Sequence, residues 1–316
     1  MFNTNFFPLL TPPVFWTFLS LVGLLLTFQI FAWLFPTKKF SDLKKRLIAW
    51  WIIFGVFALL FLTRNWCITL FWMGISYLAL KEYFQAVPKL SEHKRVRLWL
   101  YLSLPIQYLL ILTNSFIGFL IFIPVYVYLC IPVRMIIAGT PKEFLHSIGT
   151  MFWGIMMMGY SLSYIAFLST YSTQMQFEAG PLGLVLYLLI LTEINDASQY
   201  IWGKLFGKRK IVPLISPKKT YEGCFGGILT TIIFAALLSP FLTPTHFGFA
   251  TFVGILVGVG GFLGDVTMSA LKRDVQIKDF GRLLPGHGGL LDRIDSLIFT
   301  APLFFYLIYW KFGYVS

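Results

Sequence analysis

Acidic and basic residues gather with glycines in one stretch of an otherwise apolar chain. Residues 272–296 read KRDVQIKDFGRLLPGHGGLLDRIDS, and Asp265 stands shortly before them, at the end of the glycine-rich run GILVGVGGFLGD. If residues 291–296 are helical, Asp292 and Asp295 are three positions apart and share one face. Three converging carboxylates repel one another unless a cation lies between them. Mg²⁺ suits such a place, because it binds one or two carboxylates together with waters and substrate phosphates.

The bases of the same stretch could neutralise the remaining charge of a polyphosphate. Acids, bases and glycines together are what a nucleotide-dependent phosphoryl or nucleotidyl transfer needs. A salt-bridged cap of Asp292, Arg293 and Asp295 is the structural alternative. His287 lies in PGHGG, where flanking glycines let the backbone approach a ligand closely, so both a structural and a substrate-contacting role are open.

A second polar segment, residues 193–227, precedes this stretch. Asp196 lies near the end of an apolar run, where an acid is costly and is a functional candidate by default; a solvated helix end is the alternative. Further along, Ser216 and Pro217 favour a turn that can start a helix. With Lys218 and Lys219 beside it, a helix N-terminus there could hold a phosphate, because its free backbone N–H groups point the same way. Glycines at 223, 226 and 227 would permit close helix contact.

The composition shows which elements must position these residues. Of 316 residues, 58% are hydrophobic and 12% are charged, whereas soluble domains average about 25% charged. A soluble fold could not hide this much apolar surface, and continuous apolar runs exclude the alternation of a membrane barrel. We predict an all-α, polytopic membrane bundle of about nine or ten helices. The candidate spans are residues 14–36, 47–63, 66–80, 98–113, 116–133, 148–168, 181–195, 223–243, 247–267 and 294–310.

The basic residues indicate how the bundle is oriented. With these spans, most of the lysines and arginines fall in loops on one side, and only Arg64 and Lys311 fall on the other. This asymmetry is typical of cytoplasmic loops, so it accounts for most of the +12 net charge without nucleic acid. The three cysteines form no zinc or disulfide pattern. We treat residues 1–180 as N-terminal helices and 181–316 as the catalytic region of one integrated domain.

These residues resemble the signature of phosphatidate cytidylyltransferases, also called CDP-diacylglycerol synthases. The run from 269 to 295, SALKRDVQIKDFGRLLPGHGGLLDRID, fills each fixed position of that long and specific pattern. Upstream, Asp196 and Tyr200 precede GKLFGK at 203–208 and SPKKTYEG at 216–223, which are similar too. The resemblance covers residues 190–296 strongly, and before them it rests only on hydropathy.

The resemblance implies a polytopic enzyme that makes CDP-diacylglycerol from CTP and phosphatidic acid and releases pyrophosphate. It implies Mg²⁺, with K⁺ beside it, and Asp265 and Asp292 as the metal ligands. Asp295 would support the same site, and Lys218, Lys219 and Lys272 would contact phosphates. The expected catalytic residues are Asp265, Asp292, Asp295 and Lys272. Substrate contacts are expected from Asp196, Ser216, Lys218, Lys219, Arg273, Lys278, Asp279, His287 and Arg293.

Two positions depart from the family pattern and leave the lipid acceptor open. Ala197-Ser198-Gln199 replaces a Thr-Gly-Ala-type run, and Met268 stands where an acid is common. The alternatives are another nucleotidyl or phosphoryl transferase acting on a lipid phosphate, or a polytopic lipid transporter. A transporter is disfavoured because its polar residues would lie at mid-membrane in broken helices, whereas these cluster at one face. The expected partners are CTP, phosphatidic acid and the bilayer, without nucleic acid, and a homodimer stays open.

Overall fold

The computed structural model describes residues 11–34, 51–52, 54–60, 62–87, 93–139, 143–171, 177–281 and 288–313. Within these ranges the regular structure is helical, and the extended pairing that joins two described residues is one bridge between Lys210 and Thr220. The predicted all-α class is therefore confirmed. The helices are α1 (Pro12–Leu34), α3 (Asn65–Ala86), α4 (Lys94–Leu112), α5 (Phe116–Ile121), η3 (Phe122–Val127), α6 (Tyr128–Ile137), α7 (Phe144–Gly154), η4 (Ile155–Ser161), α8 (Leu162–Thr170), α9 (Gly180–Phe206), α10 (Tyr221–Leu242), α11 (Phe247–Asp274), α12 (Leu291–Ile294) and α13 (Leu297–Phe312).

Long apolar helices confirm that this is an integral membrane protein. In the described part of the chain, 5 helices are long and apolar enough to cross a bilayer. They are Phe116–Ile137, Phe144–Thr170, Gly180–Phe206, Tyr221–Leu242 and Phe247–Asp274. The helices Phe116–Ile137 and Phe144–Thr170 contain the π-helical segments η3 and η4, where the helix takes one wider turn without ending.

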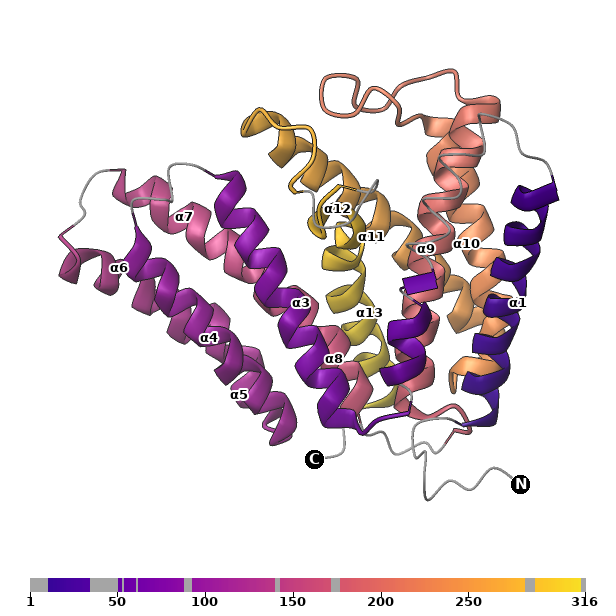
Figure 1. Ribbon diagram of the computed structural model, residues 1–316, viewed down its shortest axis with the longest axis horizontal. Coiled ribbons are helices and arrows are strands. Elements are labelled where there is room, and N and C mark those ends of the chain that lie inside the picture. The colour runs from indigo at the N-terminus through magenta and orange to yellow at the C-terminus, as the bar shows by residue number, and fades with distance from the viewer. Residues whose placement is uncertain are drawn as a thin grey trace.

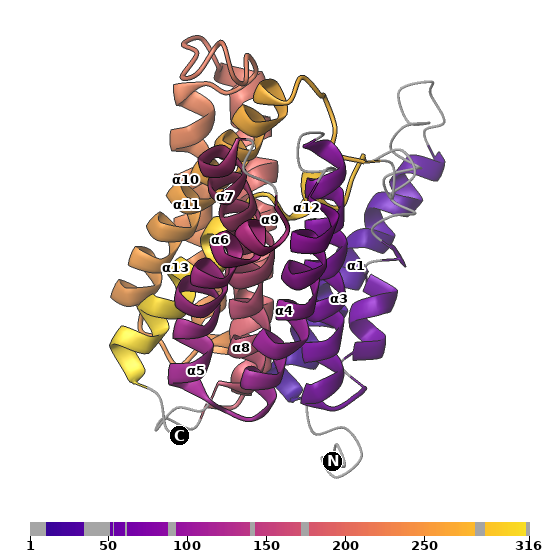
Figure 2. The ribbon, with the colours of Figure 1, turned by 90° about the vertical axis from the view of Figure 1, so that its left-hand side faces the viewer.

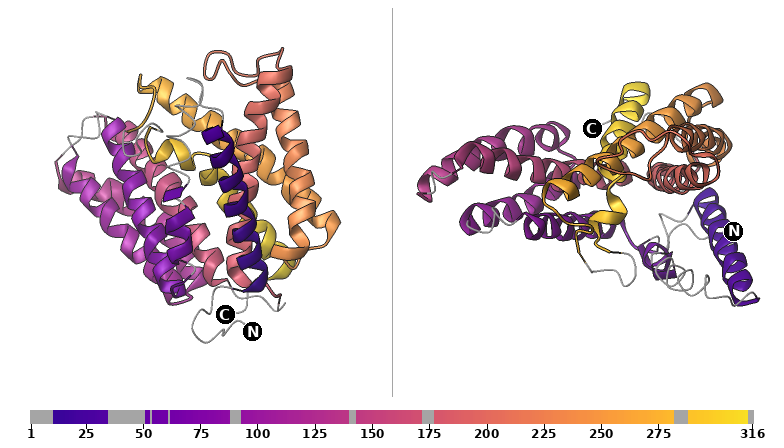
Figure 3. Two further views of the ribbon diagram at one scale, coloured as in Figure 1. Left: turned by 45° about the vertical axis from the view of Figure 1, so that its right-hand side comes forward. Right: turned by 90° about the horizontal axis from the view of Figure 1, so that it is seen from above.

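The helices form two groups joined along their length (Figure 1). Helices α3 to α7 lie on one side, and α9, α10 and α11 lie on the other. Helices α8 and α13 connect the groups, because α8 contacts α3 and α9 while α13 contacts α8 and α11. Helix α1 packs against α9 and α10, so the start of the described chain joins the C-terminal group (Figure 3). In the side view the long helices run roughly parallel to one another (Figure 2).

Glycines let the C-terminal helices approach closely. A Cβ on Gly227 would lie 2.3 Å from Cγ of Gln199, and one on Gly254 would lie 2.6 Å from the Ile232 backbone. Any side chain at these positions would push α10 away from α9 or α11. The expected close contact through the glycines of residues 223–227 is confirmed, and small residues have this effect in membrane helices generally.

The polar segments meet at one end of the bundle. The connection between α9 and α10 and the segment after α11 lie at the same end, at the top of Figure 1. The predicted spans 181–195 and 247–267 were too short at this end, because α9 continues to Phe206 and α11 to Asp274. As a result, Asp196 and Asp265 lie within continuous helices that hold their side chains in fixed positions.

Candidate active site

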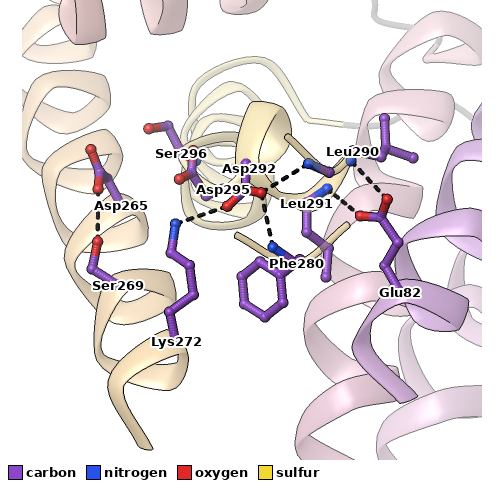
Figure 4. A network of polar contacts seen from close by, with 11 residues as sticks. Glu82, Asp265, Ser269, Lys272, Phe280, Leu290, Leu291, Asp292, Asp295 and Ser296 are labelled. Carbon is purple, nitrogen blue, oxygen red and sulfur yellow. Dashed lines mark hydrogen bonds and ion pairs between the residues drawn. The ribbon is translucent and has the colours of Figure 1, made fainter. Parts of the chain in front are cut away.

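One face of α11 carries an acid, a hydroxyl and a base in line. Asp265, Ser269 and Lys272 are spaced four and three residues apart, which places them on one helical stripe. Ser269 Oγ donates to Asp265 Oδ1 at 3.2 Å. Figure 4 shows this stripe facing the short helix α12 and the segment that follows it. The stripe therefore brings a carboxylate and an ammonium group toward the predicted signature acids.

Asp292 is held by a lysine and by the backbone. Its Oδ1 accepts from Lys272 Nζ at 2.9 Å, while its Oδ2 accepts from the N–H groups of Phe280 and Gly289, each at 3.0 Å (Figure 4). The side chains of Lys272 and Asp292 are 15% and 7% exposed. These contacts fix one carboxylate and one ammonium group at the same point. Asp292 therefore has a basic partner on α11.

A second lysine–aspartate pair lies beside the first. Lys219 Nζ is 2.6 Å from Asp265 Oδ2 and donates to Gln199 Oε1 at 3.1 Å. Gln199 belongs to α9, Lys219 to the connection before α10, and Asp265 to α11. These contacts therefore hold three segments together. They also pair Lys219 with Asp265, which the sequence predicts to be a metal ligand.

Ser296 connects two further acids of the site, Asp196 and Asp295. Ser296 Oγ donates to Asp196 Oδ1 at 2.9 Å, and the Ser296 N–H donates to Asp295 Oδ1 at 2.9 Å. Gly264 on α11 permits this approach, since a Cβ there would lie 2.6 Å from the Asp295 carbonyl oxygen. Asp295 precedes α13, and its loss of hydration raises the pKa of its carboxyl group well above the ordinary range. The Asp265 and Asp196 carboxylates raise this pKa further, as expected of acids gathered at one site.

Other predicted residues lie at the rim. Arg273 Nε donates to the Ile215 carbonyl at 3.1 Å, which ties the end of α11 to the turn that contains Ser216. Helix α10 starts after that turn, and its N-cap Thr220 accepts from the Gly223 N–H at 3.2 Å. The other predicted substrate contacts Lys218, Lys278, Asp279 and Arg293 are exposed. The predicted substrate contact His287 lies outside the described residues.

Three residues of the site were not predicted to be part of it. Ser296 directly follows the signature acids, and Gln199 was noted only as a departure from the family pattern. Glu82 on α3 is 5% exposed and accepts the N–H groups of Leu290 and Leu291 (Figure 4). A usable signal did exist for Glu82, because an acid at the end of an apolar helix is a functional candidate in a membrane protein.

The oxygen donors present suit a cation completed by substrate. Among the described residues, no group of three or more His, Cys, Asp or Glu side chains could enclose a metal ion. Asp265 and Asp292 each supply carboxylate oxygen, the ligand type that Mg²⁺ prefers when phosphates and waters fill its other positions. Carboxylates of this kind could hold a cation whose other ligands are waters and substrate phosphates.

Comparison with known proteins connects this site to one family. The family model described as the cytidylyltransferase family matches residues 44–310. The protein YnbB of Escherichia coli K12, described as uncharacterized, is 46% identical over 276 residues, which is 87% of this chain and 90% of that protein. Phosphatidate cytidylyltransferases of Staphylococcus epidermidis and Haemophilus influenzae are 40% and 41% identical over 140 and 131 residues. Those two matches span 52% and 46% of the length of these enzymes, about half.

Proposed function

Because the chain belongs to the cytidylyltransferase family, we propose that it transfers the cytidylyl group of CTP to phosphatidic acid. The products are CDP-diacylglycerol and pyrophosphate. The observation that carries this proposal is the pairing of Lys219 with Asp265 and of Lys272 with Asp292 at one end of the membrane bundle. The two phosphatidate cytidylyltransferases named above are similar to the C-terminal part of the chain, and this supports phosphatidic acid as the acceptor.

The reaction that this site would promote needs positioning more than it needs a base. A lipid phosphate oxygen attacks the α-phosphorus of CTP, the bond to the β-phosphate oxygen breaks, and pyrophosphate leaves with that electron pair. A phosphate monoester has a second pKa near 6, so its oxygen is largely ionised at neutral pH. The main obstacle is repulsion between two anions, and fixed positive charges remove it.

Lys219 and Lys272 would provide those charges. A lysine ammonium group has three N–H donors. Lys219 can hold Asp265 and Gln199 and still donate to a phosphate oxygen, and Lys272 can hold Asp292 and do the same. The carboxylates keep both ammonium groups at fixed points before substrate arrives. Asp295 and Ser296 would support the same site, because Ser296 donates to both Asp295 and Asp196.

We propose that Asp265 and Asp292 also hold Mg²⁺ together with the substrate phosphates. The bound ion would neutralise negative charge on the triphosphate. The accompanying K⁺ implied by the resemblance stays a prediction, as does a homodimer.

The direct test is an assay of the purified protein in vesicles with CTP, Mg²⁺ and phosphatidic acid. We expect CDP-diacylglycerol and pyrophosphate in equal amounts, measured by mass spectrometry and by a coupled pyrophosphate assay. All four nucleoside triphosphates and several lipid phosphates should be compared in the same preparation. Absence of product with every pair, in protein that is folded and monodisperse, would refute the proposal.

A related lipid phosphate is the second candidate acceptor. The relative that covers nearly the whole chain is YnbB, whereas the phosphatidate enzymes match only about half of their length. Gln199, which departs from the family pattern, contacts Lys219 directly. A changed lysine environment would alter recognition of the acceptor phosphate. A higher kcat/KM for another lipid phosphate than for phosphatidic acid would select this candidate.

We further propose that the site faces the cytoplasm, as the positive-inside pattern predicts. In a variant without native cysteines, Leu214→Cys and Asn114→Cys report on opposite ends of the bundle. Leu214 is 92% exposed in the loop between α9 and α10, and Asn114 lies in the turn between α4 and α5. In intact cells an impermeant maleimide should label only position 114, and permeabilisation should add position 214. The reverse pattern would overturn the orientation.

A further inference from the structure

Glu82 joins the N-terminal helices to the signature segment. Its Oε1 accepts the Leu290 N–H at 3.0 Å and its Oε2 accepts the Leu291 N–H at 2.9 Å. The first N–H groups of a helix have no partner within the helix. Glu82 therefore supplies both acceptors at the start of α12, from a helix more than 200 residues earlier in the chain.

Gly281 and Gly289, two glycines within the signature run 269–295, make room for this carboxylate. A Cβ on Gly281 would lie 2.6 Å from Glu82 Oε1, and a Cβ on Gly289 would lie 2.7 Å from Oε2. Only glycine lets the backbone close around the two oxygens at these distances. The backbone at these two glycines therefore leaves room for an acid from α3.

The same backbone holds Asp292. Three consecutive N–H groups donate to two acids: that of Gly289 to Asp292 Oδ2, and those of Leu290 and Leu291 to Glu82 (Figure 4). A shift of this segment would move Asp292 away from Lys272 as well. Helix α3 is itself anchored, because the neighbouring Tyr83 donates from its hydroxyl to the Thr150 carbonyl at 2.8 Å.

We propose that Glu82 is a positioning residue: it fixes the start of α12 and thereby sets the place of Asp292 relative to Lys272. The N-terminal helices would then take part in building the site, in addition to anchoring it in the bilayer. The consequence for turnover rests on the proposed function, but the consequence for the backbone does not.

The first test measures amide hydrogen exchange in lipid nanodiscs. In Glu82→Gln one oxygen becomes an NH₂ group, which cannot accept the N–H that it faces. Exchange at Leu290 or Leu291, whichever N–H faces the new NH₂ group, should therefore rise by about tenfold or more, while the interiors of α11 and α13 stay protected. Glu82→Asp keeps the charge but is shorter, so we expect an intermediate rise. Glu178→Gln changes an exposed acid in the same way and should leave exchange in residues 288–296 unchanged.

The second test measures turnover with CTP and phosphatidic acid. We expect Glu82→Gln to lower kcat/KM by about 10- to 100-fold, with Glu82→Asp recovering part of the loss.

Unchanged exchange at Leu290 and Leu291 would overturn the proposal, and so would faster exchange throughout the bundle, which would make Glu82 a general stability residue. Wild-type kcat/KM in Glu82→Gln would overturn the link to Asp292. If the wild-type protein makes no CDP-diacylglycerol, the proposed function fails, and the exchange measurement still decides the role of Glu82.

Discussion

Asp292→Asn is expected to bring CDP-diacylglycerol synthesis to the background level, a loss of about 10³-fold or more in kcat/KM. The carboxylate accepts from Lys272 with one oxygen and from two backbone N–H groups with the other. Asparagine has the same shape, but an NH₂ group replaces one of the two oxygens. That NH₂ group would face a donor, either Lys272 or the two backbone N–H groups, and could not accept from it. The substitution also removes the negative charge that would hold Mg²⁺ and anchor Lys272.

Asp274→Asn is the matched control for this loss. Asp274 is an exposed acid at the end of α11, close in sequence to the site but outside its contacts. Its replacement should leave kcat/KM within about twofold of the wild type, as for most surface changes. Asp292→Asn should still be expressed and folded, because the new side chain has the same size, and its fold should be checked before turnover is compared. Wild-type turnover by folded Asp292→Asn would refute both the metal assignment and the role of Asp292.

The fold class was predictable because a helix that crosses the bilayer needs about 20 mostly apolar residues, and such runs are visible in the sequence. Each long helix of the described chain overlaps a predicted span, and the glycines of residues 223–227 lie at the expected close contact. Helix ends were less predictable. Polar residues such as Asp196 lower the hydropathy before the helix stops, so α9 and α11 continue beyond the apolar runs.

The site was predictable where its residues share one element. Asp265, Ser269 and Lys272 lie on one helical stripe, so their common direction follows from spacing alone. The contact between Lys219 and Asp265 depends on how the loop before α10 folds back, and spacing does not reveal it. The contact of Glu82 with residues 290 and 291 crosses most of the chain. Only tertiary packing of α3 against α12 determines that pair.

Lys219→Met is expected to raise the KM for CTP and to lower kcat/KM by about 10²-fold. Methionine keeps much of the apolar stem and removes the ammonium group that reaches Asp265 and Gln199. Two effects combine here: a phosphate loses its counter-charge, and Asp265 loses the partner that offsets its negative charge near Asp295. Lys219→Arg keeps the charge with a different geometry and should recover part of the loss.

Lys210→Met separates this local effect from the general attraction of CTP to a basic loop. Lys210 is exposed in the same loop and pairs with Thr220 through its backbone. If the loop acts only by raising the local concentration of anions, both variants should weaken CTP binding to the same extent. At high salt both should then bind CTP as well as the wild type does. If Lys219 contacts a phosphate, its variant alone should show the large loss, and the loss should persist at high salt because the pair is partly buried. Equal effects of the two variants would remove Lys219 from the site.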